Sequence, residues 1–158
     1  MFILFVKLKL GNINSYLLYS EVYVFNASEE YLFTLSISND KVPVDNPDQN
    51  GGYSIILKGG GVLESIPDIN GNMAREMEGG LTHTLDTNDR RTWEFKWTAP
   101  ADDTAIASFL IFGNAVNGNG QPSGDEWNQL DVQVIGSDGA NLGTMPLKKA
   151  IEIKPDYL

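Results

Sequence analysis

The sequence predicts an all-β protein, an antiparallel β-sandwich of about nine short strands in a single domain that spans residues 1–158. Apolar and polar residues alternate along residues 31–38 (YLFTLSIS) and 93–97 (WEFKW), with the period of two that marks a half-buried strand. Clusters of Gly, Asn, Asp and Pro, such as NDKVPVDNPDQNGG and NGNGQPSGD, separate the apolar segments. Short strands with turn signals between them are typical of a sandwich.

Further apolar segments complete the predicted sheets. They are residues 15–25, 52–59, 81–86, 104–113, 129–136 and 146–153. Residues 64–80 are the one segment expected to accommodate a helical turn. The predicted core contains Phe33, Leu35, Ile55, Leu57, Trp93, Phe95, Trp97, Leu110, Phe112, Val132 and Val134.

Composition excludes several classes of function. The net charge is −10, with 11 Lys and Arg against 21 Asp and Glu, which argues against nucleic acid or an anionic membrane as a partner. The chain has no cysteine, so it has no disulfide, thiolate metal site or cysteine nucleophile. No apolar run approaches the ~20 residues of a membrane-spanning helix.

Residues 1–12 form an extra apolar strand at the N-terminus. Lys7 and Lys9 follow the apolar run instead of preceding it, and no cleavage signal follows, so we expect a strand and not a signal peptide. Exposed, such a strand would aggregate, so it must dock on its own sheet or add to a neighbouring subunit. One face would carry Phe2, Leu4, Val6, Leu8 and Leu10, and the other Ile3, Phe5, Lys7 and Lys9.

Two motifs in the second half of the chain occur in the order found in a known family. W-T-A-P is Trp97 to Pro100, and G-N-A-x-N-G-x-G-x-x-S-G-D is Gly113 to Asp125. Over residues 20–136 the chain resembles the reeler domain and its prokaryotic "choice-of-anchor V" relatives. The resemblance implies an immunoglobulin-like sandwich on an extracellular or cell-surface protein, and no catalysis. The animal members carry disulfides, which this chain lacks.

Oxygen-rich loops raise the question of a bound ion or ligand. Residues 46–51 (NPDQNG) resemble the first half of a calcium loop, although Asn46 takes the place of the first Asp and Leu57 that of the bidentate Glu. The candidate metal ligands are Asp45, Asp48, Asn50 and Asp125, with calcium as the candidate cofactor and none required. The candidate ligand-binding residues are Asn114, Asn117, Asn119, Asp125 and Trp127. The alternative is a structural loop whose asparagines bond their own backbone.

Nothing in the sequence indicates an enzyme. His83 is the only histidine, no nucleophile elbow accompanies it, and its place in LTHTLD favours a structural role. A hydrolase would need activity that disappears in His83→Ala. Asn26-Ala-Ser28 is a glycosylation sequon and points weakly to a secreted protein.

These observations favour a non-catalytic extracellular or cell-surface module with a structural or adhesive role. The N-terminal strand would join copies of the chain into a filament, so the expected partner is the chain itself, with a glycan or cell-surface partner in addition. The alternative is a calcium- or carbohydrate-binding module that uses the Asn-, Asp- and Gly-rich loops.

Overall fold

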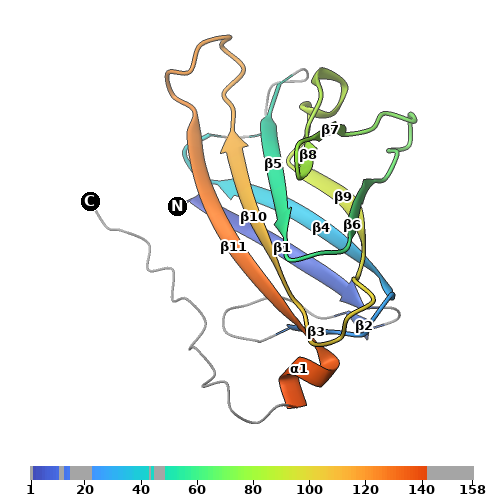
Figure 1. The fold of residues 1–158 in the computed structure, drawn as a ribbon. Helices are drawn as coiled ribbons and strands as arrows, with labels where there is room; N and C mark the ends of the chain where they lie inside the picture. The colour runs from blue at the N-terminus through green and yellow to red at the C-terminus, as the bar shows by residue number, and fades with distance from the viewer. Residues whose placement is uncertain (1, 11–12, 15–22, 43, 45–48, 142–158) are drawn as a thin grey trace.

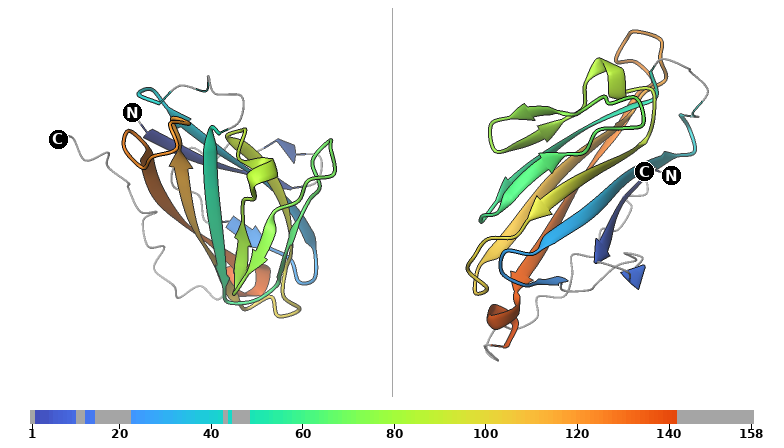
Figure 2. Two further views of the ribbon diagram at one scale, coloured as in Figure 1. Left: turned by 90° about the horizontal axis from the view of Figure 1, so that it is seen from above. Right: turned by 90° about the vertical axis from the view of Figure 1, so that its right-hand side faces the viewer.

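The computed structural model describes residues 2–10, 13–14, 23–42, 44 and 49–141, and the predicted strand at 146–153 lies outside them. Within these residues two sheets face one another (Figures 1 and 2). The strands are β1 (Phe2–Leu10), β2 (Ile13–Asn14), β3 (Tyr23–Phe25), β4 (Glu30–Asn39), β5 (Gly51–Lys58), β6 (Val62–Ser65), β7 (Arg75–Met77), β8 (Gly80–Thr82), β9 (Thr92–Thr98), β10 (Ile106–Ala115) and β11 (Glu126–Gly136).

The strand order confirms the predicted sandwich. One sheet has the order β2-β1-β4-β9-β6 and the other β3-β11-β10-β5-β8-β7. The series β1-β4-β9-β6 and β11-β10-β5 match the A-B-E-D and G-F-C sheets of an immunoglobulin domain. One pairing departs from the antiparallel expectation, because β3 runs parallel to β11.

In β4 and β9 the buried residues are those that the alternation of apolar and polar residues predicted. Residues Phe33, Leu35, Phe95 and Trp97 are buried, and their polar neighbours face outward. Among the residues whose burial the structure describes, the buried apolar side chains are Phe25, Tyr31, Phe33, Leu35, Ile37, Val42, Tyr53, Ile55, Leu81, Trp93, Phe95, Trp97, Ala99, Ala107, Phe109, Ile111, Ala115 and Val134. Leu57 and Val132 are half-buried and pack against this set.

The predicted face of β10 was wrong. Phe109 and Ile111 are the buried residues, whereas Leu110 and Phe112 are half-buried on the outer face of the sheet. The segment reads Phe-Leu-Ile-Phe, so apolar residues occupy both faces and the sequence carries no alternation that selects one of them.

The predicted helical turn was also misplaced. Residues 64–80 contain the end of β6, all of β7 and the start of β8, and no helix. The helical segments among the described residues are a short 3-10 turn at Leu85–Thr87 and α1 at Ser137–Asn141. The β10–β11 loop projects at one end of the sandwich, and α1 lies at the opposite end (Figure 1).

The N-terminal strand is the second strand of the five-stranded sheet, between β4 and the two-residue border strand β2. β1 pairs antiparallel with β4 over Phe2–Lys9, with Leu4 opposite Ile37, Val6 opposite Leu35 and Leu8 opposite Phe33. Paired residues share one face of a sheet, so this register places alternate β1 positions opposite the core positions of β4. The side view in Figure 2 shows β1 outside β4.

The face assignment of β10 predicts a large difference between two neighbouring phenylalanines. Phe109→Ala removes a fully buried ring and should lower the free energy of unfolding by about 3–5 kcal/mol. Phe112→Ala, on the outer face, should cost roughly 1–2 kcal/mol. Urea denaturation of both variants measures the difference, and equal or reversed losses would contradict the assignment.

Candidate functional site

The Asn-rich loop between β10 and β11 bonds to itself. Asn117 and Asn119 each donate a side-chain amide to the Ser123 carbonyl, at 2.9 and 3.0 Å. The side-chain oxygen of Asn117 accepts the Asn119 amide at 3.0 Å, and that of Asn119 accepts the Gln121 amide at 2.7 Å. One carboxylate oxygen of Asp125 accepts the Asn117 amide at 3.0 Å. These side chains therefore replace the sheet as hydrogen-bond partners of the loop backbone.

The glycines of this loop are required by its backbone. Gly118, Gly120 and Gly124 have φ of 70°, 71° and 84°, a region that other residues adopt at a cost. A Cβ at Gly124 would collide with the Asn117 side-chain amide. The geometry agrees with the structural interpretation of the loop.

A buried arginine, which the sequence did not reveal, lies at the base of the loop. Arg91 is 6% exposed; its Nε donates to the Asn50 carbonyl at 2.8 Å and its Nη1 to the Val42 carbonyl at 2.6 Å. The Val116 amide, where the loop begins, donates to the same Asn50 carbonyl at 3.0 Å. One guanidinium thus bridges the carbonyls of Val42 and Asn50, and the Asn50 carbonyl is also hydrogen-bonded to the start of the loop. In the sequence, Arg90 and Arg91 form a charged pair next to Asp89, which resembles a solvated turn.

The candidate metal ligands fall in three different situations. Asp45 and Asp48 lie outside the described residues. Asn50 is buried beside the Arg91 guanidinium, whose positive charge opposes a cation there, and Asp125 belongs to the self-bonded loop. Within the described part of the chain, no three His, Asp or Glu side chains are grouped so that they could hold a metal. Calcium binding stays a prediction.

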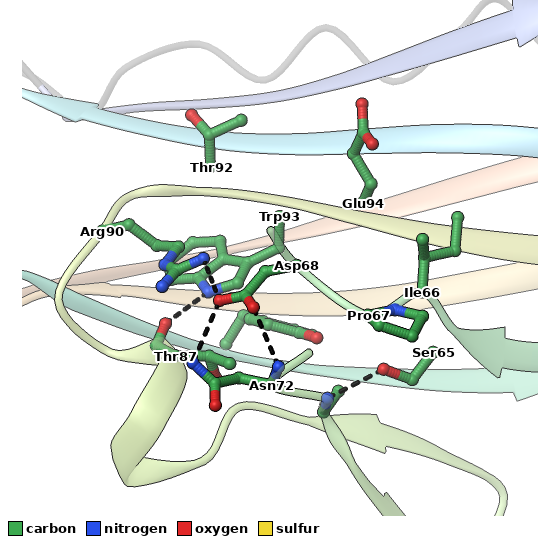
Figure 3. Close-up of a pocket in the computed structure, with 12 residues that line it drawn as sticks. Ser65, Ile66, Pro67, Asp68, Asn72, Thr87, Arg90, Thr92, Trp93 and Glu94 are labelled. Atoms are coloured by element: carbon green, nitrogen blue, oxygen red, sulfur yellow. Dashed lines mark hydrogen bonds and ion pairs between the residues drawn. The ribbon is translucent and has the colours of Figure 1, made fainter. Parts of the chain in front are cut away.

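A second oxygen-rich fragment, Asp68 to Asn72, forms the rim of a cavity of about 260 Å³ (Figure 3). Arg90 forms an ion pair with the Asp68 carboxylate at 2.7 Å, and the amides of Asn70 and Asn72 each donate to its other oxygen at 2.8 Å. Burial raises the pKa of Tyr53, which also lines the cavity, to about 12. The phenol is therefore protonated at neutral pH.

The Asp68 carboxylate is held in its ionised form. Burial would raise its pKa, but the Asn72 and Asn70 amides and the Arg90 and Asn72 side chains donate to the carboxylate and bring the pKa below the ordinary value of 3.8. A carboxylate with this many donors is a poor proton donor or acceptor at neutral pH. Asp68 is therefore not a candidate general acid or general base for this cavity.

His83 has a structural environment. Its Nδ1 lies 3.1 Å from the backbone nitrogen and 3.0 Å from the carbonyl oxygen of Tyr53, and its tautomer decides which of the two it bonds. The ring occupies the space above Gly52, where a Cβ would lie 2.6 Å from Cε1. The ring thus packs against the backbone of β5. This agrees with the structural role expected from the sequence.

Two of the candidate ligand residues lie together on the outer face. Asn114 on β10 pairs directly with Trp127 on β11, and Trp127 is 70% exposed. The other tryptophans, Trp93 and Trp97, are buried, as the alternation predicted. Asn117, Asn119 and Asp125 belong to the adjacent loop, where their bonds are internal.

The β1 edge is the other candidate site. On the side away from β4, β2 pairs only with Lys9 and Leu10 among the described residues. Backbone groups of an edge strand that lack a neighbouring strand are available to pair with another chain.

Comparisons with known proteins identify no family. No protein-family model matches the chain, and no curated protein matches it significantly. A solution structure of residues 27–141 of a conjugate transposon protein from Bacteroides vulgatus is similar, with 13% identity, a TM-score of 0.47 and coverage of 79% of this chain and 82% of that one. A conjugative transposon lipoprotein from Bacteroides eggerthii is similar, with 9% identity, a TM-score of 0.41 and coverage of 82% and 95%. Neither similarity bears on function.

No helix within the described ranges has the length and apolar character needed to cross a membrane.

The ion pair at the cavity rim predicts the pH behaviour of Asp68. Its pKa, followed by carboxyl carbon NMR, should lie below 3.8 and should rise in Arg90→Gln, which removes one donor. Because the folded pKa is below the unfolded one, the stabilisation by Asp68 is complete above pH ~4 and is lost as the pH falls through the folded pKa. An unchanged pKa in Arg90→Gln would contradict the described geometry.

Proposed function

We propose that this protein is a non-catalytic structural or adhesive module of the cell surface that assembles with copies of itself through β1. The observation that carries the proposal is the place of β1. It is an apolar strand of nine residues that pairs along one side with β4, and on the other side only its last two residues pair with β2 among the described residues. Its sequence, FILFVKLKL, would be an aggregation site if left uncovered.

The connection after β1 is long enough for exchange. Residues 11–22 separate Leu10 from Tyr23, the start of β3. Twelve residues span at most about 40 Å when extended, which requires β2 at Ile13–Asn14 to give up its pairing with β1. A nine-residue strand is about 30 Å long, so this connection permits β1 to reach a neighbouring sandwich.

Exchange would preserve the contacts of the strand. A β1 strand that pairs with β4 of another copy makes the same hydrogen bonds and fills the same positions as it does in its own chain. The pairing energy therefore cancels between the two arrangements, and protein concentration and the connection decide between them. A head-to-tail exchange does not close on itself and builds a filament.

The contacts of two titratable residues support a non-catalytic role. Asp68 is held ionised by its donors, and His83 packs over Gly52 with its Nδ1 beside the Tyr53 backbone. The proposed cell-surface location rests on two segments, residues 97–100 and residues 113–125, that resemble the motifs of reeler domains.

Removal of residues 1–12 tests the proposal. The truncated chain should stay folded and soluble by circular dichroism and should be monomeric by sedimentation, whereas the intact chain should form polymers that grow with concentration. A synthetic peptide of residues 1–12 should bind the truncated chain and, added to the intact chain, should shorten the polymers.

A peptide with Leu4→Asp and Val6→Asp is the matched control, since charges at positions opposite Ile37 and Leu35 should prevent pairing. A truncated chain that unfolds and is not rescued by the peptide would contradict the proposal. An intact chain that remains monomeric at high concentration would contradict it equally.

A further inference from the structure

The outer face of the six-stranded sheet carries two neighbouring rows of uncharged residues, one across three strands and one across four. The register places Trp127 beside Asn114, and Asn114 beside Gly52. The next row runs through Gln129, Phe112, Ser54 and Thr82. All of these positions alternate with core residues, so they lie on the face away from the second sheet.

Taken together, the two rows have an aromatic side chain at one end and a hollow at the other. Trp127 is the large exposed aromatic residue of the described chain, and its indole projects from β11. At the other end, Arg75, Thr82, His83, Thr84 and Leu85 line a hollow of about 300 Å³. Gly52 lies between the two ends and has no side chain, and the His83 ring occupies the space above it.

Exposure and polarity distinguish this face from a protein core. Asn114, Phe112 and Ser54 are half-buried, and Gln129 is exposed, so amide and hydroxyl groups alternate with aromatic rings. The two rows contain no charged side chain before Arg75 at the margin, and the whole chain carries a net charge of −10. An acidic ligand would be repelled by the molecule as a whole, and a basic one would find no carboxylate within the rows.

We propose that this face binds a neutral polysaccharide. The apolar faces of sugar rings stack on aromatic side chains, and their hydroxyl groups exchange hydrogen bonds with amides and hydroxyls. Trp127 is the stacking residue, Asn114 and Gln129 supply the amides beside it, and the hollow beside His83 receives the far end of the ligand.

The dimensions suit a short stretch of sugar chain. Neighbouring strands lie about 4.8 Å apart, so the distance from β11 to β8, across three spacings, is about 14 Å. This length suits a short oligosaccharide laid across the strands. The ligand would then run from the indole of Trp127 to the hollow.

Tryptophan fluorescence tests the assignment, because Trp93 and Trp97 are buried and Trp127 is exposed. We use the intact chain with cellohexaose, xylohexaose and mannohexaose, and with hexagalacturonate as the acidic probe. At least one neutral hexasaccharide should shift the emission and protect it from iodide quenching, and hexagalacturonate should not. Trp127→Ala should weaken binding, measured by calorimetry, by about tenfold or more, whereas Trp127→Phe should retain most of it.

Ile69→Ala is the matched control, because Ile69 is a fully exposed apolar side chain away from these rows. It should bind as the unchanged chain does. Circular dichroism should show each variant folded. Binding of none of the neutral hexasaccharides, or binding that Trp127→Ala leaves unchanged, would overturn the proposal. The result is independent of self-assembly, since the truncated chain that lacks residues 1–12 keeps every residue of this face.

Discussion

The packing of Trp97 is the interaction on which the rest of the structure depends. Its ring meets those of Phe25 and Phe109 edge-on, at 5.3 and 5.2 Å between centroids, and those of Tyr31 and Phe33 at 5.6 and 6.3 Å. Phe25 and Phe109 belong to one sheet and the other three rings to the other sheet, so the cluster joins the layers. Each aromatic pair contributes about 0.5–1.5 kcal/mol beyond the stabilisation that comes from the area it buries. The indole N–H is satisfied by the Gly60 carbonyl at 3.3 Å.

Both proposals concern parts of the molecule outside this aromatic cluster, which are β1 and the outer face of the six-stranded sheet. Its five rings come from β3, β4, β9 and β10, so this aromatic cluster does not include β1, which contacts the other sheet at β11. The proposed sugar-binding face is the outer face of the other sheet, and the inner face of that sheet packs against the sheet that contains β1. A filament joined through β1 would therefore repeat this face along its length. Weak binding by one face would become strong through many of them.

Sequence patterns predicted the elements in which a local rule was unambiguous. β4 and β9 alternate cleanly, and the buried positions of Phe33, Leu35, Phe95 and Trp97 follow from that period alone. In β10 four consecutive apolar residues remove the signal, and only packing against the second sheet selects Phe109 over Phe112. The short strands β6, β7 and β8 have too few residues for a period to appear, which is why a helical turn was expected near them.

Local sequence rules predicted the β10–β11 loop, whereas long-range contacts determine the surroundings of Arg91. The glycines and asparagines of the β10–β11 loop predicted a self-bonded turn, because both kinds of residue act on the backbone within a few positions. The partners of Arg91 come from residues 42 and 50, far from it in sequence, and no spacing reveals them.

The exchange of β1 between copies is tested most directly by a mixed cross-link. Lys7 pairs with Thr34, and Thr34 pairs with Glu94 on β9. In a chain without cysteine, Lys7→Cys in one copy and Thr34→Cys in a differently sized copy can form this disulfide only if β1 is exchanged, since paired Cα atoms lie within bonding range. Lys7→Cys mixed with Glu94→Cys is the negative control. Exchange of β1 predicts a Lys7→Cys to Thr34→Cys heterodimer that increases with concentration. Its absence, with complete cross-linking inside a chain that carries both substitutions, would contradict exchange.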